Sequence, residues 1–210
     1  MTRYIYLHVF ASSPQSNKAR FFHRQFAARG IDLEIPLLDQ GNFTELTVTG
    51  QLGVIERTAG DDPVTLIGSS LGGYLAALFA ARHRSVQKLV LMAPALQFPR
   101  RFRERYAPED LARWKREGTV PVFHYGYKEE RPLSFQIVED AAKYEDCPDF
   151  REPALILHGI QDDVVPVEIS RVYASGHPNV TLREFPSGHE LTDVLGDLWA
   201  ETERFLGLAV

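Results

Sequence analysis

The sequence predicts an α/β fold in which helices cover both faces of a mostly parallel β-sheet. Short apolar or β-branched runs alternate with segments of helical periodicity along most of the 210 residues. The alternation is sharpest in residues 63–83, where a strand passes into an apolar helix with no loop between them. With 44% hydrophobic residues the chain can bury one sizeable core, so we expect a single domain over residues 1–210.

Charge and composition argue against several classes of protein. The formal net charge of −5 argues against a protein that binds nucleic acid. Cys147 is the only cysteine, so no intrachain disulfide can form, and its acidic neighbours make it a poor nucleophile. No apolar run approaches the roughly 20 residues of a membrane span, and the N-terminus lacks the features of a signal peptide. We therefore expect a cytoplasmic protein with no membrane partner.

Strands and helices are expected to alternate along the chain. Numbered in chain order, the six expected strands are 4–10, 31–35, 64–67, 87–92, 154–157 and 180–185. Helices are expected from Ala19 to a cap at Gly30, over 44–59, from the third strand to about His83, over 167–175, and from Leu191 onward. Strands separated by helices pair in parallel through right-handed crossovers, which place the helices on both faces of the sheet.

Residues 97–147 interrupt this alternation. The segment lies between the fourth and fifth strands and is rich in arginine and aromatic residues, with scattered Pro and Gly. We expect it to form a small cap over the edge of the sheet. Its arginines alternate with acidic residues, which is typical of a solvated surface, although contact with an anionic substrate remains open. His124 and Tyr125 are its candidate substrate-binding residues.

The strand-to-helix turn points to a nucleophile. A turn this sharp strains the backbone of its middle residue, and glycines two residues before and after remove β-carbons that would collide. Gly68 and Gly72 each lie two residues from Ser70, whereas the residues two away from Ser69 are not glycines. A serine at a helix N-terminus also lies beside unpaired backbone N–H groups, which stabilise a developing oxyanion. The turn is typical of enzymes that transfer acyl groups.

An activated serine needs a base, and the base needs an acid to orient it. In an open parallel sheet the site lies beyond the carboxyl ends of the strands, so both partners must follow strands. His189 follows the sixth strand, whereas His177 precedes it, so His189 is the expected base and His124, in the segment 97–147, stays a minor candidate. Asp162 and Asp163 both follow the fifth strand, and composition does not choose between them.

Three motifs in the order Ser, Asp, His resemble the α/β-hydrolase superfamily. They are Gly68-x-Ser70-x-Gly72, His158-Gly159-x-x-Asp162-x-x-Val165-Pro166 and Gly188-His189. The stretch Leu7-His8-Val9-Phe10-Ala11-Ser12-Ser13-Pro14 is similar to the first strand and loop of small single-domain bacterial esterases. The resemblance implies Asp162 as the acid and an oxyanion hole made by the backbone N–H groups of Leu71 and Phe10. It also implies a six-stranded α/β-hydrolase sheet in the order 2-1-3-4-5-6.

Val9 departs from the family pattern, in which a glycine follows the histidine of the first strand. A β-branched side chain restricts the backbone at this position. We expect Val9 to narrow the space beside Ser70, to contact the substrate and to favour small acyl groups.

The sequence therefore predicts a serine hydrolase that cleaves a small carboxylic ester or thioester with Ser70, His189 and Asp162, and with no metal or cofactor. Its expected partner is a small-molecule substrate, and the oligomeric state stays open. A non-catalytic binding protein, in which Val9 blocks the oxyanion hole, is one alternative. Peptidase-type or haloperoxidase-like chemistry on the same three residues is another, because a fold and a triad do not specify a substrate.

Overall fold

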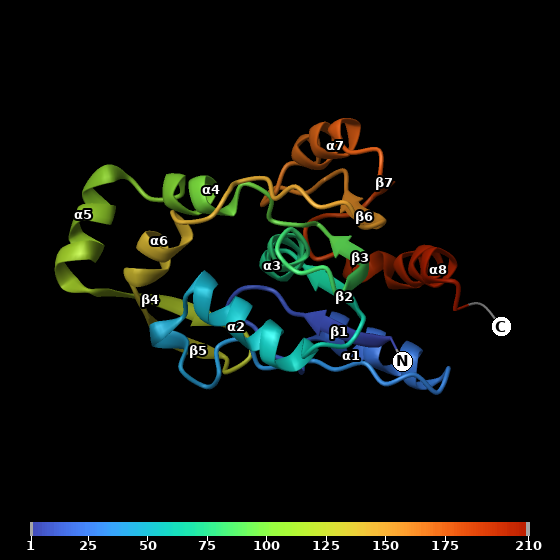
Figure 1. Cartoon of the computed structure of the whole chain (residues 1–210). Coiled ribbons are helices and arrows are strands. Elements are labelled where there is room, and N and C mark those ends of the chain that lie inside the picture. Colours follow the sequence, from blue (N-terminus) through green and yellow to red (C-terminus); the bar gives the residue numbers. More distant parts are fainter. Residues whose placement is uncertain (1, 209–210) are drawn as a thin grey trace.

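The computed structural model describes residues 2–208 and contains a five-stranded parallel sheet in the order β1-β2-β3-β6-β7 (Figure 1). The strands are β1 Arg3–Leu7, β2 Val64–Ser69, β3 Val86–Met92, β6 Ala154–Gly159 and β7 Val180–Phe185. Each strand pairs in parallel with its neighbour. The predicted α/β class with a mostly parallel sheet is confirmed.

The predicted second strand is reduced to one isolated bridge, so the sheet has five strands and not six. Glu34 pairs in parallel with Ile5, and its backbone hydrogen-bonds to Tyr4 and Tyr6 at 2.9 and 2.8 Å. The next rung of a parallel ladder would need an N–H from residue 36, and Pro36 has none. The remaining strands follow the predicted order.

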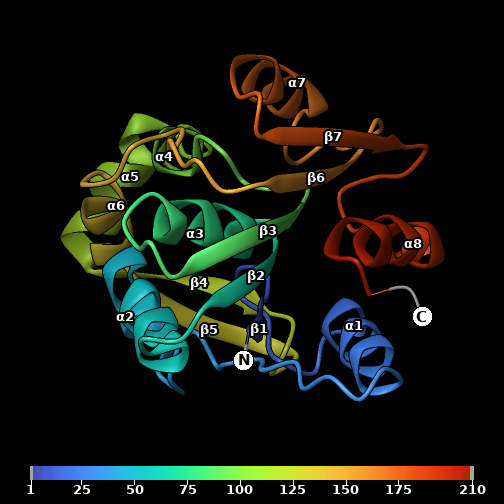
Figure 2. The same ribbon diagram turned by 45° about the vertical axis from the view of Figure 1, so that its right-hand side comes forward.

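Five helices flank the sheet: α1 Asn17–Ala27, α2 Val48–Ala59, α3 Leu71–Ala80, α7 Val167–Gly176 and α8 Leu195–Leu206. Short 3-10 turns, η1 Phe43–Glu45 and η2 Thr192–Val194, precede α2 and α8. Figure 2 shows α1 and α8 on one side of the sheet and α2 and α3 on the other. No helix within residues 2–208 is both long enough and apolar enough to cross a bilayer.

Alternating side chains of the strands divide the core in two. Ile5 and Leu7 pack with α2 and α3, whereas Tyr6 between them packs with α1 and α8. This is the two-residue period of a strand that is covered on both faces. The prediction that helices cover both faces is therefore confirmed.

Side-chain caps explain where α1 and α2 begin. Ser16 Oγ accepts a hydrogen bond from the N–H of Ala19 at 3.4 Å, and Thr47 Oγ1 accepts one from Gly50 at 2.9 Å. α3 begins differently, because Ser70 occupies the capping position and its side chain caps no amide. Its hydroxyl is free to bind another partner.

The segment between β3 and β6 forms α4 Phe98–Glu104, α5 Pro108–Glu117, β4 Thr119–His124, β5 Glu129–Ser134 and α6 Gln136–Ala141. β4 and β5 form an antiparallel hairpin, separate from the main sheet. Trp114 is fully buried within the segment and donates its Nε1–H to the Leu133 carbonyl at 3.0 Å. The segment gathers at one end of the sheet (Figure 1), and α4 supplies side chains to the site described next.

Candidate active site

Ser70 occupies the turn between β2 and α3 with φ 53° and ψ −115°. A residue other than glycine adopts this backbone conformation only under strain. A β-carbon on Gly68 would lie 2.3 Å from the carbonyl oxygen of Gly72, and one on Gly72 would lie 2.1 Å from that of Leu7. Glycine is therefore required on both sides of Ser70 by close backbone contacts, which explains the sequence pattern.

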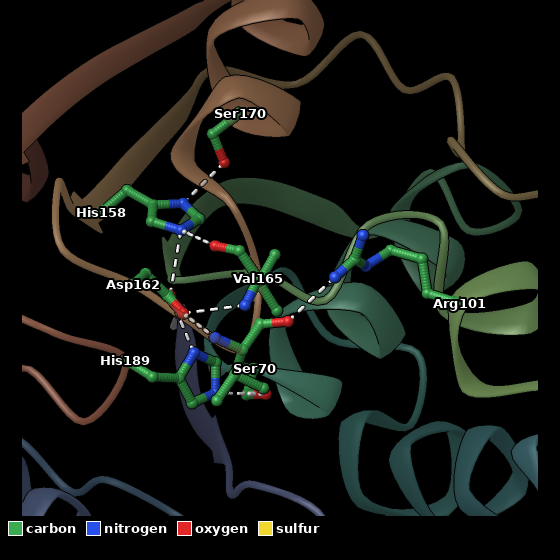
Figure 3. A network of polar contacts seen from close by, with 8 residues as sticks. Ser70, Arg101, His158, Asp162, Val165, Ser170 and His189 are labelled. Atoms are coloured by element: carbon green, nitrogen blue, oxygen red, sulfur yellow. Dashed lines mark hydrogen bonds and ion pairs between the residues drawn. The ribbon is translucent and has the colours of Figure 1, made fainter. Parts of the chain in front are cut away.

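Ser70, His189 and Asp162 form one hydrogen-bonded chain (Figure 3). His189 Nε2 lies 3.0 Å from Ser70 Oγ, and His189 Nδ1 lies 2.8 Å from Asp162 Oδ2. A carboxylate only accepts hydrogen bonds, so Nδ1 carries the proton and the lone pair of Nε2 faces the serine hydroxyl. The imidazole is held in the tautomer that can take a proton from Ser70.

The loops that carry Asp162 and His189 follow the adjacent parallel strands β6 and β7. Their starting points lie side by side because parallel strands end at the same edge of a sheet. The N–H of Gln161 donates to the carbonyl of Ser187 at 3.0 Å, which joins the two loops just before Asp162 and His189. Two groups that are 27 residues apart in the chain are thereby held within hydrogen-bond distance.

Asp162 accepts hydrogen bonds from four groups in a buried position. Its Oδ2 lies 2.8 Å from His189 Nδ1 and 3.1 Å from His158 Nε2, and its Oδ1 accepts from the amides of Val164 and Val165 at 2.9 and 2.8 Å. Burial raises the pKa of Asp162, but the hydrogen bonds from His158, His189 and Val165 outweigh burial and hold the pKa well below its usual range. Asp162 is therefore ionised at neutral pH.

The geometry distinguishes the residues between which composition could not choose. Asp163 is exposed and makes no hydrogen bond to His189 among the described residues, although it lines the cavity beside Ser70. His177 precedes β7, where its Nδ1 donates to the carbonyl of Tyr173 at 2.7 Å. Asp162 and His189, and not these neighbours, lie on the hydrogen-bonded chain to Ser70.

His158 is a partner of Asp162 that sequence reasoning did not assign. It is fully buried, with Nε2 also 2.9 Å from the Val165 carbonyl and Nδ1 2.8 Å from Ser170 Oγ. Both oxygens near Nε2 are acceptors, so Nε2 carries the proton and Nδ1 accepts from the Ser170 hydroxyl. Figure 3 shows His158 and His189 on either side of Asp162. Its place at the end of a predicted strand, just before the loop that carries Asp162, was the available signal.

A model of the uncharacterised protein family UPF0227 matches residues 3–204. The chain belongs to UPF0227. The matched region includes the Ser70 turn, the Asp162 loop and His189. Among curated proteins, none matches this UPF0227 protein by sequence.

Solved structures similar to this UPF0227 protein include several hydrolases. A putative hydrolase from Agrobacterium vitis has a TM-score of 0.81 at 21% identity, covering 97% of this chain and 87% of that one. Alpha/beta hydrolase domain-containing protein 10 from mouse has a TM-score of 0.80 at 19% identity, covering 97% and 88%. Est1E from Butyrivibrio proteoclasticus, with ferulic acid bound, has a TM-score of 0.79 at 19% identity, covering 99% and 90%. The implied α/β-hydrolase fold is confirmed, and identities this low show the fold alone.

A cavity of about 300 Å³ opens beside Ser70 in this UPF0227 protein. Phe10 and Leu71, the residues expected to supply the oxyanion hole, both line it. Neither of their amides donates a hydrogen bond to another group within residues 2–208, so both are available to a ligand. The other lining residues come from three stretches: Ala95 and Leu96; Phe98, Arg101, Phe102 and Arg105; and Asp163, Val164 and Val165.

Val9 does not line this cavity, contrary to the expectation that its side chain narrows the space beside Ser70. The Val9 carbonyl accepts a hydrogen bond from His8 Nδ1 at 3.0 Å. His8 Nε2 accepts the N–H of Leu38 at 3.4 Å, so Nδ1 is the protonated nitrogen. These contacts fix the loop after β1, and Phe10 is the residue of this loop that reaches the cavity.

His124 and Tyr125 do not line the cavity beside Ser70 either, because the β4–β5 hairpin packs against other loops. His124 is buried, with Nε2 3.7 Å from Asp39 Oδ2 and its ring edge-to-face with Phe43 at 4.8 Å. Tyr125 is exposed, and its amide donates to the carbonyl of Ala11 at 2.8 Å. The described residues contain no group of three His, Cys, Asp or Glu side chains arranged to hold a metal ion.

The part of the 97–147 segment that does reach the cavity is one face of α4, together with Arg105, which caps the C-terminus of the helix. Phe98, Arg101, Phe102 and Arg105 follow the i, i+3, i+4, i+7 spacing of a helix face, and all four line the cavity. This spacing was visible in the sequence. It did not lead to an assignment of these residues to the site, because neither the helix nor the side on which it packs was predicted.

Proposed function

We propose that this UPF0227 protein is a serine hydrolase that cleaves a small carboxylic ester or thioester through an acyl-enzyme on Ser70. The observation that carries the proposal is the chain from Ser70 Oγ through His189 to Asp162, with distances of 3.0 and 2.8 Å. A serine hydroxyl is a weak nucleophile by itself, and an oriented imidazole activates it. The structural similarity to proteins described as hydrolases and lipases supports the same class of reaction.

In the first half-reaction, Ser70 Oγ attacks the carbonyl carbon while its proton passes to His189 Nε2. The carbonyl oxygen becomes an oxyanion, which the amides of Leu71 and Phe10 stabilise with hydrogen bonds. When the carbonyl re-forms, the bond to the leaving alcohol or thiol breaks, and the leaving group takes the proton from Nε2. The acyl group remains on Ser70.

In the second half-reaction, water attacks the acyl carbon and gives a proton to His189 Nε2. Collapse of the second tetrahedral intermediate releases the carboxylic acid, and Ser70 Oγ recovers the proton. Asp162 keeps its negative charge throughout and stabilises the imidazolium that forms in each step. The depressed pKa of Asp162, which follows from its hydrogen bonds despite burial, suits this role.

The test compares Ser70→Ala with Ser69→Ala. Ser69 is a matched control because it is adjacent in sequence, buried in β2 and absent from the cavity wall. The substrates are nitrophenyl esters from acetate to palmitate together with acyl-CoA thioesters, and a fluorophosphonate probe reports covalent labelling. We expect Ser70→Ala to abolish hydrolysis and labelling, and Ser69→Ala to remain folded and substantially active.

Other outcomes would contradict the proposal. Equal loss of activity in both variants, with both folded by circular dichroism, would remove Ser70 from the nucleophile role. Failure of the wild-type protein to hydrolyse any substrate or to react with the probe would favour a non-catalytic binding protein. Faster cleavage of peptide amides than of esters would favour a peptidase on the same residues.

A further inference from the structure

We propose that the Ser70 cavity selects substrates that carry an anionic group, a carboxylate or a phosphate, and that Arg101 and Arg105 bind this group. The inference rests on the proposed function, because it concerns a different part of the same substrate. It adds a chemical class of substrate, which neither the triad nor the fold specifies.

The two arginines reach the cavity because Arg101 lies on α4 and Arg105, the residue that caps its C-terminus, keeps a helical backbone conformation. Arg101 and Arg105 are four residues apart, so they lie on the same helix face one turn from each other. Phe98 and Phe102 share this face, and all four line the cavity that contains Ser70. The wall of the cavity that contains Ser70 therefore combines aromatic rings with two guanidinium groups.

Arg101 is held in place by the loop that carries Asp162. One nitrogen of its guanidinium donates to the Val164 carbonyl at 3.0 Å. Figure 3 shows the Arg101 side chain pointing toward the loop that carries Val165. The amide of the same Val164 donates to Asp162 Oδ1 at 2.9 Å. A guanidinium has five N–H donors, so this single bond leaves donors for a ligand. Arg101 is thus positioned relative to the chain of Ser70, His189 and Asp162 before any substrate binds.

Neither guanidinium group is paired with a carboxylate within ion-pair distance among the described residues. Arg100, on another face of α4, forms an ion pair with Asp146, with Nε 3.6 Å from Oδ2. Neither Arg101 nor Arg105 forms an ion pair with any acidic side chain that the structure describes. Asp163 is the acidic residue in the cavity wall, so two positive charges face one negative charge. Arginine without a carboxylate partner binds carboxylate and phosphate in a bidentate geometry.

The aromatic side chains indicate what separates the anion from the reacting carbonyl. Phe98 and Phe102 stack at 4.9 Å, and Phe10 meets Phe102 edge-on at 5.7 Å. Phe10 also belongs to the expected oxyanion hole, so this aromatic surface extends from the reacting carbonyl toward α4. A cavity of about 300 Å³ is at the small end of ligand sites. The substrate that fits is a small ester with a short apolar or aryl spacer before its anionic group.

The test uses two pairs of esters, and each pair compares an anionic ester with a neutral ester of similar shape. The charge lies in the leaving group in one pair and in the acyl group in the other. Acetylated 4-hydroxybenzoate and acetylated 4-hydroxybenzamide carry the difference in the leaving group. The monophenyl ester of adipic acid and phenyl hexanoate carry it in the acyl group. For each pair the readout is the ratio of kcat/KM for the anionic ester to that for the neutral ester. A charge-assisted hydrogen bond predicts a preference of about ten- to a hundred-fold for the anionic ester in at least one pair.

The variants Arg101→Gln and Arg105→Gln should each lower this ratio by about five-fold or more. Arg105→Lys should lower it less than Arg105→Gln, because lysine keeps the positive charge but not the bidentate geometry. Arg103→Gln is the matched control, because Arg103 is an exposed residue of α4 outside the cavity wall, and its ratio should equal that of the wild type. Asp163→Asn should raise the ratio, because it removes the negative charge of the wall. A ratio near one in both pairs, or a ratio that neither arginine variant changes, would overturn the inference.

A binding measurement separates this inference from the proposed function. Calorimetry with Ser70→Ala protein and either 4-hydroxybenzoate or 4-hydroxybenzamide requires no catalysis. Tighter binding of the carboxylate, lost when Arg101→Gln is added, would support the anion site even if no ester were hydrolysed. Equal affinities for the two compounds would overturn it, while Ser70-dependent hydrolysis of neutral esters would leave the proposed function intact.

Discussion

His158 and Asp162 are four residues apart, and both side chains are buried and joined by a contact of 3.1 Å between Nε2 and Oδ2. Asp162 is therefore held from two sides, because His189 contacts the same oxygen at 2.8 Å. The pKa of Asp162 lies below its usual range although burial raises it, since the hydrogen bonds from His158 and His189 outweigh burial. His158 is thus a positioning residue for the carboxylate.

Replacing His158 should lower the free energy of unfolding, and it should also make this free energy depend less on pH in the acid range. His158→Leu should lower the free energy of unfolding by about 1–3 kcal/mol, because the buried carboxylate of Asp162 loses a donor. A carboxyl with a depressed pKa stabilises the fold above its unfolded pKa of about 3.9 and loses this contribution as the pH falls. Denaturant titrations between pH 2 and 7 should therefore show a smaller acid-dependent loss of stability in His158→Leu than in wild type. Ser170→Ala, which removes only the outer hydrogen bond, is the control, and equal effects would contradict the role.

The two adjacent aspartates should differ strongly in their effect on turnover. Asp162→Asn should lower kcat by on the order of 10³–10⁴, because an amide has one acceptor oxygen and one donor nitrogen. It therefore cannot accept from both histidines and from the amides of Val164 and Val165 at once, and it no longer fixes the tautomer of His189. Asp163→Asn should stay within about tenfold of wild type on a neutral ester. Steady-state kinetics with nitrophenyl acetate measure both. The reverse ranking would show that Asp163 orients the base.

The histidines on either side of β7 provide a similar comparison. His189→Ala should lower kcat by on the order of 10⁴–10⁶, because Ser70 loses its proton acceptor. His177→Ala should stay within about tenfold, because His177 precedes β7 and stacks on Tyr173. Imidazole added to the assay should restore part of the His189→Ala activity. A near-normal rate in His189→Ala would contradict the assignment of the base.

Lys18 should make stability depend on pH in the alkaline range. It is buried in the first turn of α1, and burial lowers its pKa to about 8, although attraction to Glu190 and Asp162 opposes this shift. Below pH 8 the folded protein holds a charged amine that the unfolded chain solvates better, and this destabilisation disappears between about pH 8 and 10.5. Lys18→Met should therefore be more stable at pH 7, by on the order of 3 kcal/mol.

The difference between Lys18→Met and wild type should shrink as the pH rises toward 10.5. Urea denaturation of both proteins from pH 7 to 10.5 measures it, and ionisation of other groups cancels in the comparison. A constant difference over this range would mean that the amine is not responsible.

Val9→Gly should leave acyl-chain specificity nearly unchanged, because Val9 does not line the cavity. The ratio of kcat/KM for octanoate and acetate esters should stay within about threefold, with a loss of stability of at most about 1 kcal/mol from added backbone freedom. Val164→Ala, which shortens a side chain that does line the cavity, should raise the ratio. A clear rise in Val9→Gly alone would restore the interpretation that Val9 limits the acyl group.

The residues near Ser70 were predictable because local backbone sterics determine them. Glycine at 68 and 72 is required by contacts of 2.3 and 2.1 Å within the turn and with Leu7, so the pattern in the chain already points to Ser70. The alternation of strands and helices was predictable for a related reason. Each element buries an apolar face whose period, two or 3.6 residues, is visible in the residues themselves. The expected cytoplasmic location and the absence of a cofactor stay predictions.

Only the tertiary structure decided the features that depend on contacts between residues far apart in the chain. Residues 31–35 have the apolar character of a strand, yet only Glu34 pairs, because Pro36 cannot donate the next hydrogen bond to β1. His124 and Arg101 both belong to the 97–147 segment, and packing turned His124 toward Asp39 and Arg101 toward the cavity. Such directions are not encoded in spacing along the chain, because they follow from contacts between elements that come together only when the whole core is buried.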